Sequence, residues 1–279
     1  MPEANAQPGS AYLLSEIGIR DEAQRLRRQA ALMLALELPA LLDSVPRGGT
    51  FTDLGCGTGL LADTVAHARP DATVRGFDAD EGAVDLSRRR FGDRANVAFA
   101  CRRVEQGPPE GQPPADAVAL RLVLMHLPGP VEALRSAAAW VRPGGVLHVL
   151  EGDDRAFRFR PEPAGIARIL DLMQAVQERK GGSRRLGQDL AALMTAAGWA
   201  QVGVEERAPE PAFAAAAAGQ VFLPVADFYL AEAQRLGEAD ADEAASLARG
   251  LRAAVEAGLH GVHAPIFHAW GRNSGGAAA

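Results

Sequence analysis

The feature that most constrains this chain is a glycine-rich loop directly after a short apolar stretch. Residues 51–59 read Phe-Thr-Asp-Leu-Gly-Cys-Gly-Thr-Gly, and apolar residues at helical spacing follow from Leu60. Glycines at such a strand-to-helix junction let the backbone turn tightly and let a ligand lie against the main chain. Ligands of open α/β sheets bind beyond the carboxyl ends of the strands. The loop therefore predicts an α/β sheet with a ligand site at this point.

The spacing of the glycines disfavours a phosphate-binding loop. A dinucleotide fingerprint would place its third glycine where this chain has Leu60, whereas here that glycine comes one residue earlier, at Gly59. A P-loop would need a Lys followed by Ser or Thr, which this segment lacks. Asp78 closes the next expected strand, where an acidic side chain can accept the hydroxyl hydrogens of a ribose. The two motifs together predict a ribose-bearing ligand and do not require a pyrophosphate.

Strand-like and helix-like segments alternate between residues 51 and 150, and this pattern predicts the fold class. Such alternation is typical of an α/β protein with a mostly parallel sheet and helices on both faces. Helices are also expected over residues 20–43, 163–179 and 186–197, and in the Ala-rich stretch 212–259. The seven expected strands cover residues 51–54, 73–77, 97–101, 117–122, 146–150, 201–206 and 265–270.

The chain divides into four expected regions. The first, over residues 1–45, is an N-terminal helical lid, and residues 46–208 are a Rossmann-like cofactor-binding core. Residues 209–263 are a helical insertion that caps the substrate, and residues 264–279 hold the last strand of the core and a disordered tail. The 279 residues are ample for one substantial core with a lid.

Composition narrows the classes of partner and compartment. The net charge of −6, from 29 Lys and Arg against 35 Asp and Glu, argues against a nucleic-acid partner, because phosphate binding needs a cationic surface. Cys56 and Cys101 are expected to be free, buried thiols, which fits a reducing compartment. The sequence shows no signal-peptide pattern and no apolar run that approaches a membrane span. We therefore expect a cytoplasmic protein that does not contact a membrane.

Four stretches of the chain carry a family resemblance. Residues 51–62, 76–80, 121–128 and 142–145 resemble the class I S-adenosylmethionine-dependent methyltransferases, in the order and at the intervals of that family. The resemblance is closest to bacterial enzymes that methylate small metabolites. It implies a Rossmann-like fold with a helical lid, S-adenosyl-L-methionine as cofactor, and methyl transfer to a small-molecule acceptor, in particular a specialised (natural-product) metabolite.

The resemblance also implies which residues hold the cofactor. Asp53 and Gly55 would meet the methionine amino group, Gly57 would lie under the cofactor, and Asp78 would hold the ribose. Tyr12 and Arg25, in the lid, would cover the cofactor and pair with its carboxylate, although helix packing and a solvated charge are equally ordinary roles for them. The remaining residues that the resemblance implies as cofactor contacts are Ala79 and Val104 near the adenine, Arg121 and Leu122 at the methionine end, and Cys56 in the loop.

Arg103 departs from the pattern of the family. Methyltransferases of this class usually have an acidic residue at this position, which binds the adenine amino group, and the local sequence here is Cys-Arg-Arg-Val-Glu over residues 101–105. A guanidinium cannot accept that hydrogen bond. Either backbone groups hold the adenine beside Arg103, or Glu105 takes the role.

Three residues are candidates for catalysis. His126 follows the strand whose end would face the methyl group, so it is a candidate general base, but in this motif it more often caps or packs. Glu151, the second candidate, ends the strand over 146–150 together with Asp153 beside the expected acceptor, where a solvated loop is the alternative. Tyr12, in the expected lid, is the third candidate.

Two further groups of side chains have less specific patterns. Three histidines lie before or within the last strand, and packing or a place in the acceptor pocket is expected for them ahead of a metal site, so no metal is predicted; they are His260, His263 and His268. Five arginines could bind a phosphate or carboxylate of a substrate, or form solvated faces around the lid; they are Arg155, Arg158, Arg160, Arg184 and Arg185.

Alternative functions remain open at this point. A chain of this fold could bind the cofactor without transferring methyl, as a cyclase or a regulatory protein, since fold does not dictate function. An RNA or protein methyltransferase is less favoured, because the chain is acidic and shows no appended recognition module. The N-terminal helix is a candidate for pairing between subunits, so a homo-oligomer is one expectation.

Overall fold

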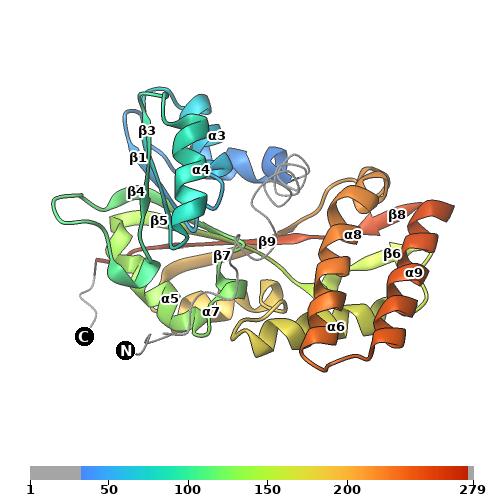
Figure 1. The fold of residues 1–279 in the computed structure, drawn as a ribbon. Helices are drawn as coiled ribbons and strands as arrows, with labels where there is room; N and C mark the ends of the chain where they lie inside the picture. The colour runs from blue at the N-terminus through green and yellow to red at the C-terminus, as the bar shows by residue number, and fades with distance from the viewer. Residues whose placement is uncertain (1–32, 276–279) are drawn as a thin grey trace, which may run out of the picture.

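A seven-stranded sheet forms the centre of the computed structural model, which describes residues 33–275. The strand order is β3-β2-β1-β4-β5-β9-β7, and β9 runs antiparallel to both its neighbours while the first five strands of that order are parallel (Figure 1). The expected fold class is thereby confirmed. The strands are β1 (Thr50–Leu54), β2 (Thr73–Asp78), β3 (Val97–Cys101), β4 (Ala115–Arg121), β5 (Val141–Gly152), β7 (Ala200–Arg207) and β9 (Ile266–Arg272).

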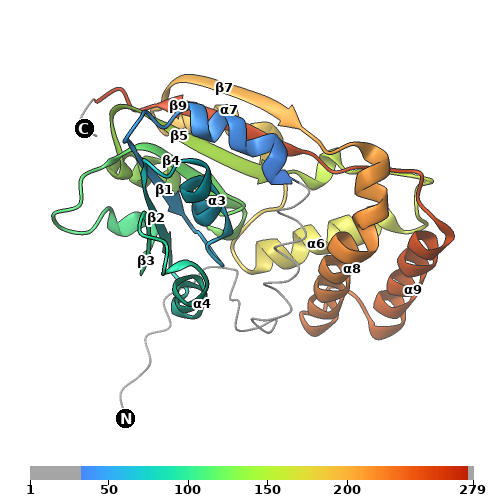
Figure 2. The ribbon, with the colours of Figure 1, turned by 90° about the horizontal axis from the view of Figure 1, so that it is seen from above.

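Helices cover both faces of the sheet. One face is packed by the helix over residues 33–43 together with α3 (Leu60–Ala68) and α4 (Glu81–Phe91), and the other by α5 (Pro130–Ala137) and α7 (Leu190–Ala196) (Figure 2). Side chains of a strand alternate between faces, so Ala117 and Ala119 of β4 join the first layer while Val118 and Leu120 join the second. A sheet buried on both faces explains the near-continuous apolar runs of its strands.

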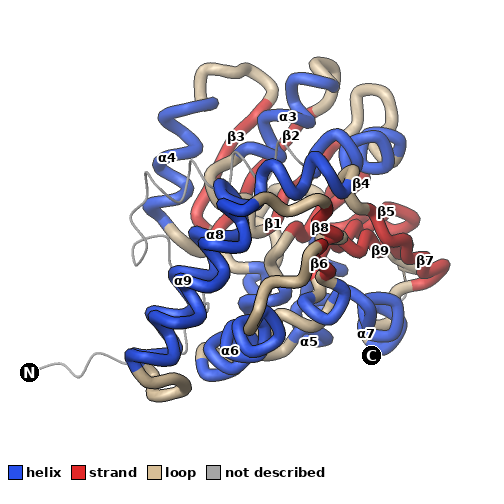
Figure 3. The backbone as a smooth tube through the Cα atoms, turned by 90° about the vertical axis from the view of Figure 1, so that its right-hand side faces the viewer, coloured by secondary structure: helices blue, strands red, loops and turns tan. Residues whose placement is uncertain are grey.

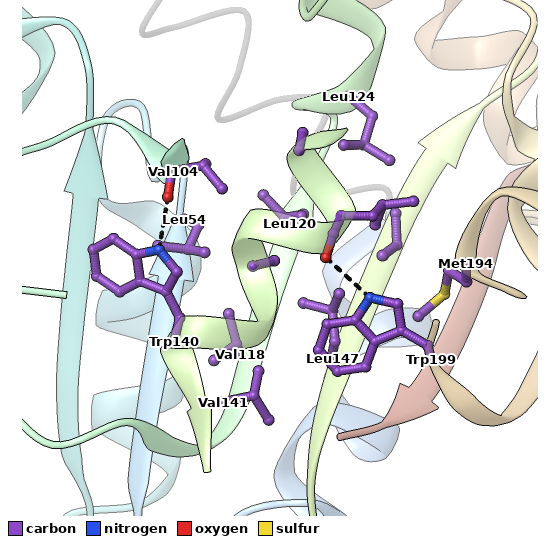
Figure 4. Packing of buried hydrophobic residues seen from close by; sticks show 14 of the residues in the cluster. Leu54, Val104, Val118, Leu120, Leu124, Trp140, Val141, Leu147, Met194 and Trp199 are labelled. Carbon is purple, nitrogen blue, oxygen red and sulfur yellow. Dashed lines mark hydrogen bonds between the residues drawn. The ribbon is translucent and has the colours of Figure 1, made fainter. Parts of the chain in front are cut away.

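Two tryptophans anchor the layer that contains α5 and α7. Trp140, in the 3-10 turn η3 (Ala138–Trp140), is 1% exposed and donates its indole N–H to the carbonyl oxygen of Val104 at 2.9 Å (Figure 4). Trp199 likewise donates to the carbonyl oxygen of Leu134 at 3.0 Å. A buried indole N–H needs such a partner. The first bond matters for function, because it fixes the turn η1 (Val104–Gln106) after β3 to the core.

A second lobe holds the helices α6 (Ile166–Arg179), α8 (Pro211–Arg235) and α9 (Ala241–Ala257) with a two-stranded sheet of β6 (Arg158–Arg160) and β8 (Gly261–His263) (Figure 3). Its apolar side chains form a cluster of their own, in which Phe159 and Ile169 pack with α8. We call this lobe the cap. The cap therefore begins well before residue 209, because β6 and α6 pack against α8 and not within the expected core. The two short strands were not expected from the sequence.

Helix α8 corrects an expectation about apolar runs. By length and composition it would be able to cross a membrane, since its most apolar window has a mean hydropathy of 1.4. In the fold, 44% of that window is buried, and the helix packs against α6, α9 and β8. Pro224 also lies within it. These contacts are those of a helix that packs one part of its surface within the cap.

Candidate active site

The glycine-rich loop lies at the carboxyl ends of β1 and β2. Its three glycines have positive φ angles, 72° at Gly55, 52° at Gly57 and 78° at Gly59, a backbone conformation that favours glycine. The amides of Gly55 and Cys56 both donate to the carbonyl oxygen of Phe77, at 2.7 and 2.9 Å. Because β1 lies between β2 and β4, the loop stands at the point where the strand order reverses, which is where such sheets bind ligands.

Gly55 and Gly57 meet different surroundings. A Cβ atom on Gly55 would lie 2.4 Å from a methyl group of Val123, so this glycine allows the loop to pack against the segment after β4. A Cβ atom on Gly57 would meet nothing within 4 Å. The backbone at Gly57 therefore faces open space in which a ligand can lie directly on the main chain.

The side chain of Asp53 has a buried oxygen that can accept a hydrogen bond. The residue is 1% exposed, and its Oδ2 atom has no hydrogen-bond partner in the described part of the chain. Burial raises the pKa of Asp53 to about 7, an effect that the positive charge of Arg121 opposes. Since buried polar atoms nearly always have a partner, the carboxylate fits a cationic donor such as the amino group of a bound methionine moiety.

Asp78 closes β2 beside the loop. Its Oδ2 atom accepts from the amide of Gly57 at 2.7 Å, and its Oδ1 atom accepts from the amide of Asp80 at 2.9 Å. Burial raises the pKa of Asp78 and these two amides oppose the rise. Each carboxylate oxygen has a lone pair left for a further donor, so the orientation suits the two hydroxyl groups of a ribose. The loop, Asp53 and Asp78 thus fit S-adenosylmethionine.

Arg121 forms an ion pair with Glu37, which was not among the site residues predicted from the sequence. Its guanidinium donates to both carboxylate oxygens of Glu37, at 2.6 and 3.2 Å, and Glu37 is fully buried. The pair ties the helix over residues 33–43 to the end of β4, where Arg121 was expected to line the methionine end. Leu122 follows with a positive φ of 57°. A lone acidic residue in the apolar run over 33–38 was the available signal for Glu37.

The expected adenine side lies in the turn after β3. The side chains of Arg103 and Glu105 pair with each other at 3.5 Å, and both are more than two-fifths exposed. Val104 between them is buried. The thiol of Cys101 contacts the carbonyl oxygen of Ala79 at 3.6 Å and is exposed, so the expectation of two buried thiols was wrong for Cys101 and right for Cys56. That these residues hold an adenine stays a prediction.

Glu151 takes a structural place. It is fully buried at the end of β5, and its Oε1 atom accepts from the amide of Leu124 at 2.6 Å. Burial raises the pKa of Glu151 to about 8, although the amides of Val123, Leu124 and Met125 oppose the rise. Glu151 thus binds the amide of the first residue of the 3-10 turn η2 (Leu124–His126). Its Oε2 atom has no hydrogen-bond partner in the described part of the chain, so the expected catalytic role of Glu151 stays a prediction.

His126 ends η2 and reaches the cap. Its Nδ1 atom lies 3.2 Å from the side-chain nitrogen of Gln177 on α6. The two lid residues expected at the site, Tyr12 and Arg25, lie outside the described residues.

Several of the remaining candidate side chains form pairs. Arg155 binds Asp153, Arg184 binds Asp154, and Arg185 binds Asp171. His268 and His148 share a hydrogen bond of 2.9 Å on the sheet, and burial lowers the pKa of His268 to about 4. Across residues 33–275, no group of three or more His, Cys, Asp or Glu side chains is arranged to hold a metal ion.

Known proteins share this arrangement. A family model described as a methyltransferase domain matches residues 52–147, which contain the loop, Asp78 and η2. This stretch of the chain is therefore similar to methyltransferase domains. The chain is also 36% identical over 104 residues to the ubiquinone biosynthesis O-methyltransferase of Alkalilimnicola ehrlichii. That match covers 37% of this chain and only 40% of the relative's length, so it bears on the cofactor domain and not on the cap.

Solved structures are similar to this chain over most of its length. The [4+2]-cyclase SpnF is 22% identical with a TM-score of 0.52, and the match covers 85% of this chain and 80% of the cyclase. Phosphoethanolamine N-methyltransferase 2 of Haemonchus contortus, solved with S-adenosyl-L-methionine, is 15% identical with a TM-score of 0.51 and covers 84% of this chain and 51% of its own. At these identities the likeness shows the Rossmann-like fold alone.

Proposed function

We propose that this protein transfers a methyl group from S-adenosylmethionine to a small-molecule acceptor in the biosynthesis of a specialised metabolite. The observation that carries the proposal is the open backbone at Gly57 between two carboxylates, one with an orphaned oxygen and one beside the loop amides. Two carboxylates at this spacing suit the ammonium group and the ribose of the cofactor, and they would repel a phosphorylated ligand.

The residues of the chain mainly bind and orient. S-adenosylmethionine, when bound, supplies a methyl group already activated on a sulfonium centre, so the protein's share is positioning and exclusion of water. Asp53 would hold the amino group, Asp78 the ribose, and the backbone of Gly57 the face of the cofactor. The cap, joined to η2 through α6, would enclose the acceptor beyond the end of β4.

Two observations favour a particular chemical class of acceptor. The relatives matched in the cofactor domain methylate oxygen in ubiquinone biosynthesis, which favours a phenolic acceptor for this chain. The net charge of −6 favours a small molecule over RNA. We also propose that the protein acts in the cytoplasm, away from membranes and nucleic acid, and that subunit pairing, if present, involves its N-terminal helix.

A second candidate function is cofactor binding without methyl transfer, as in a cyclase. The observation that favours it is that Glu151, one of the expected catalytic residues, is buried as a cap of η2. The likeness to the [4+2]-cyclase is one of fold and does not favour this candidate by itself.

Binding and turnover assays separate the two candidates. Titration calorimetry should show S-adenosylmethionine binding that Asp78→Asn weakens at least tenfold, a loss of about 1.4 kcal/mol. Asp85→Asn is the matched control, since Asp85 pairs with Arg88 on the surface of α4. The purified protein is then incubated with methyl-labelled cofactor and a panel of phenols and catechols. Labelled product supports the enzyme; cofactor binding with no product from any acceptor or cell extract would favour the scaffold, and no binding would refute both.

A further inference from the structure

A second cavity lies beside the end of the helix over residues 33–43. Its volume is about 560 Å³, which suits a small ligand. Its floor is the face of β5, β9 and β7 on which this helix packs, and its wall includes Asp43 and Ser44 at the end of the helix. Strand β4 lies between β5 and β1, and none of the described residues expected to hold the cofactor lines the cavity. The cavity is therefore separate from the glycine-rich loop.

Two buried histidines of adjacent strands form part of the floor. The Nδ1 atom of His148 lies 2.9 Å from the Nε2 atom of His268, and the Nε2 atom of His148 lies 2.8 Å from the hydroxyl oxygen of Ser44. Burial lowers the pKa of His148 to about 3 and the pKa of His268 to about 4, so both rings are neutral at neutral pH. Three of the four ring nitrogens have a partner, whereas the Nδ1 atom of His268, a fully buried residue, has none in the described part of the chain.

The hydroxyl of Ser44 decides which ring nitrogens carry hydrogen. It donates to the carbonyl oxygen of Ala40, one helical turn earlier, at 3.1 Å. Its oxygen therefore accepts from Nε2–H of His148, and the Nδ1 atom of His148 accepts from Nε2–H of His268, because a neutral ring has only one hydrogen. The same count leaves the Nδ1 atom of His268 without hydrogen. The unpartnered nitrogen is thus an acceptor.

The charged groups around this nitrogen are also acceptors. The Nδ1 atom of His268 lies 3.6 Å from the Oε1 atom of Glu205, and neither atom has a hydrogen to share. Arg207 donates to the Oε1 atom of Glu205, which leaves the Oε2 atom for a ligand. The exposed carboxylate of Asp43 lines the cavity as well. Buried acceptors nearly always have a donor, and a cationic donor suits carboxylates best.

We propose that this cavity binds a protonated organic amine, whose ammonium group bonds Glu205 and the Nδ1 atom of His268 and whose apolar part lies against Trp270. An ammonium group has donors and no acceptor, so it satisfies both partners. The indole of Trp270 lines the cavity with its ring centre 5.6 Å from that of His268, and an aromatic face attracts a cation. Glu205 is 43% exposed on the edge strand β7, so its side chain can turn to admit the ammonium group. Arg272, which also lines the cavity, donates to the carbonyl oxygen of Gly144.

Three probes with the same ring and different charges test the proposal. At neutral pH benzylamine is a cation, benzyl alcohol is uncharged and benzoate is an anion. Titration calorimetry of the whole protein should show that benzylamine binds at least tenfold more tightly than the other two probes. Absence of benzylamine binding, or equal binding of another probe, would overturn the proposal. Saturation with S-adenosylmethionine should leave the affinity for benzylamine unchanged, whereas competition would place the amine at Asp53 and refute the cavity as its site.

Two neighbouring carboxylates provide a variant and its matched control. Glu205→Gln should weaken benzylamine binding at least tenfold. Glu206→Gln is the control, because Glu206 is the next residue of β7 and its carboxylate bonds His263 at 2.8 Å outside the cavity lining. This control should bind benzylamine as the wild type does. Equal losses in both variants, or no loss in Glu205→Gln, would count against the proposed site.

The hydrogen within the histidine pair gives a test that needs no variant. In protein labelled with ¹⁵N histidine, coupling between two nitrogens across a hydrogen bond identifies His148 and His268 among the six histidines. The bridging hydrogen should lie on an Nε2 atom, that of His268. A bridging hydrogen on an Nδ1 atom would mean that His148 donates and that the unpartnered nitrogen of His268 carries hydrogen. That result would overturn the proposal even if Glu205→Gln does not fold.

Discussion

Alanine substitution at two glycines distinguishes loss of cofactor contact from the effect of backbone strain. Gly57 and Gly48 both have positive φ angles, 52° and 67°, and a Cβ atom on either would meet nothing within 4 Å. Gly57 lies in the candidate cofactor loop, whereas Gly48 lies in the turn before β1. The two substitutions therefore impose similar strain in similar space, and they differ only in whether that space is expected to hold a ligand.

The magnitudes follow from the same geometry. A left-handed conformation costs alanine roughly 1–2 kcal/mol, and the lower entropy of the unfolded chain offsets about 0.4–1 kcal/mol of this. Gly57→Ala and Gly48→Ala should each lose about 1 kcal/mol of unfolding free energy in urea titrations. If the cofactor lies on the backbone at Gly57, the alanine side chain of Gly57→Ala occupies the space where the cofactor would contact the loop. The dissociation constant of S-adenosylmethionine should then rise at least tenfold, a loss of about 1.4 kcal/mol of binding free energy.

Titration calorimetry of both variants provides the decisive comparison. Gly48→Ala should bind S-adenosylmethionine as the wild type does, and Gly57→Ala should bind it weakly or not at all while remaining folded. Equal affinity in the two variants would show that the cofactor does not contact Gly57. In Gly55→Ala the side chain would collide with Val123 at 2.4 Å, so this third variant should lose stability first.

Three other outcomes are expected. Burial raises the pKa of Asp53 from 3.8 to about 7, so between these pH values the folded state holds a proton that the unfolded state has released. The free energy of unfolding should therefore fall as the pH rises through this range. Asp53→Asn should reduce that slope in denaturant titrations. Glu37→Gln should cost roughly 3 kcal/mol of unfolding free energy by calorimetry, because it leaves the half-buried Arg121 charge unpaired. Gly182→Ala should speed hydrogen exchange in α6, since its methyl group displaces the turn from Met125.

The cofactor half of the site was predictable because its determinants are local. Three glycines within five residues have left-handed backbone at alternate positions, and Asp78 is the last residue of the next strand. Strand alternation likewise predicted each strand of the main sheet within a few residues, apart from β5, which begins before the turn expected at Pro143. Such features depend on backbone chemistry that a linear sequence displays.

The acceptor half was not predictable because its determinants are distant in the chain. The bonds from Gln177 to His126 and Tyr229 span 51 and 52 residues, and Glu37 pairs with Arg121 across 84. No local pattern marks Gln177 or Tyr229, and Glu37 is marked only as a lone acidic residue in an apolar run. Glu151 shows the same limit: a carboxylate at a strand end suits catalysis, and only the fold shows that its Oε1 atom accepts from the amide of Leu124 in η2.

The turn η2 is the element that joins both halves of the site. Val123, at its start, packs against the cofactor loop so closely that Gly55 cannot bear a side chain. Glu151 holds the amides of η2 from the sheet, and Gln177 holds its carbonyl from the cap. Because close-packed contacts transmit displacement, a shift of the cap would move Val123 toward or away from the loop. Gly182→Ala should therefore weaken cofactor binding as well as loosen α6, although residue 182 lies in the cap. Unchanged affinity in that variant would show that η2 holds its place without the cap.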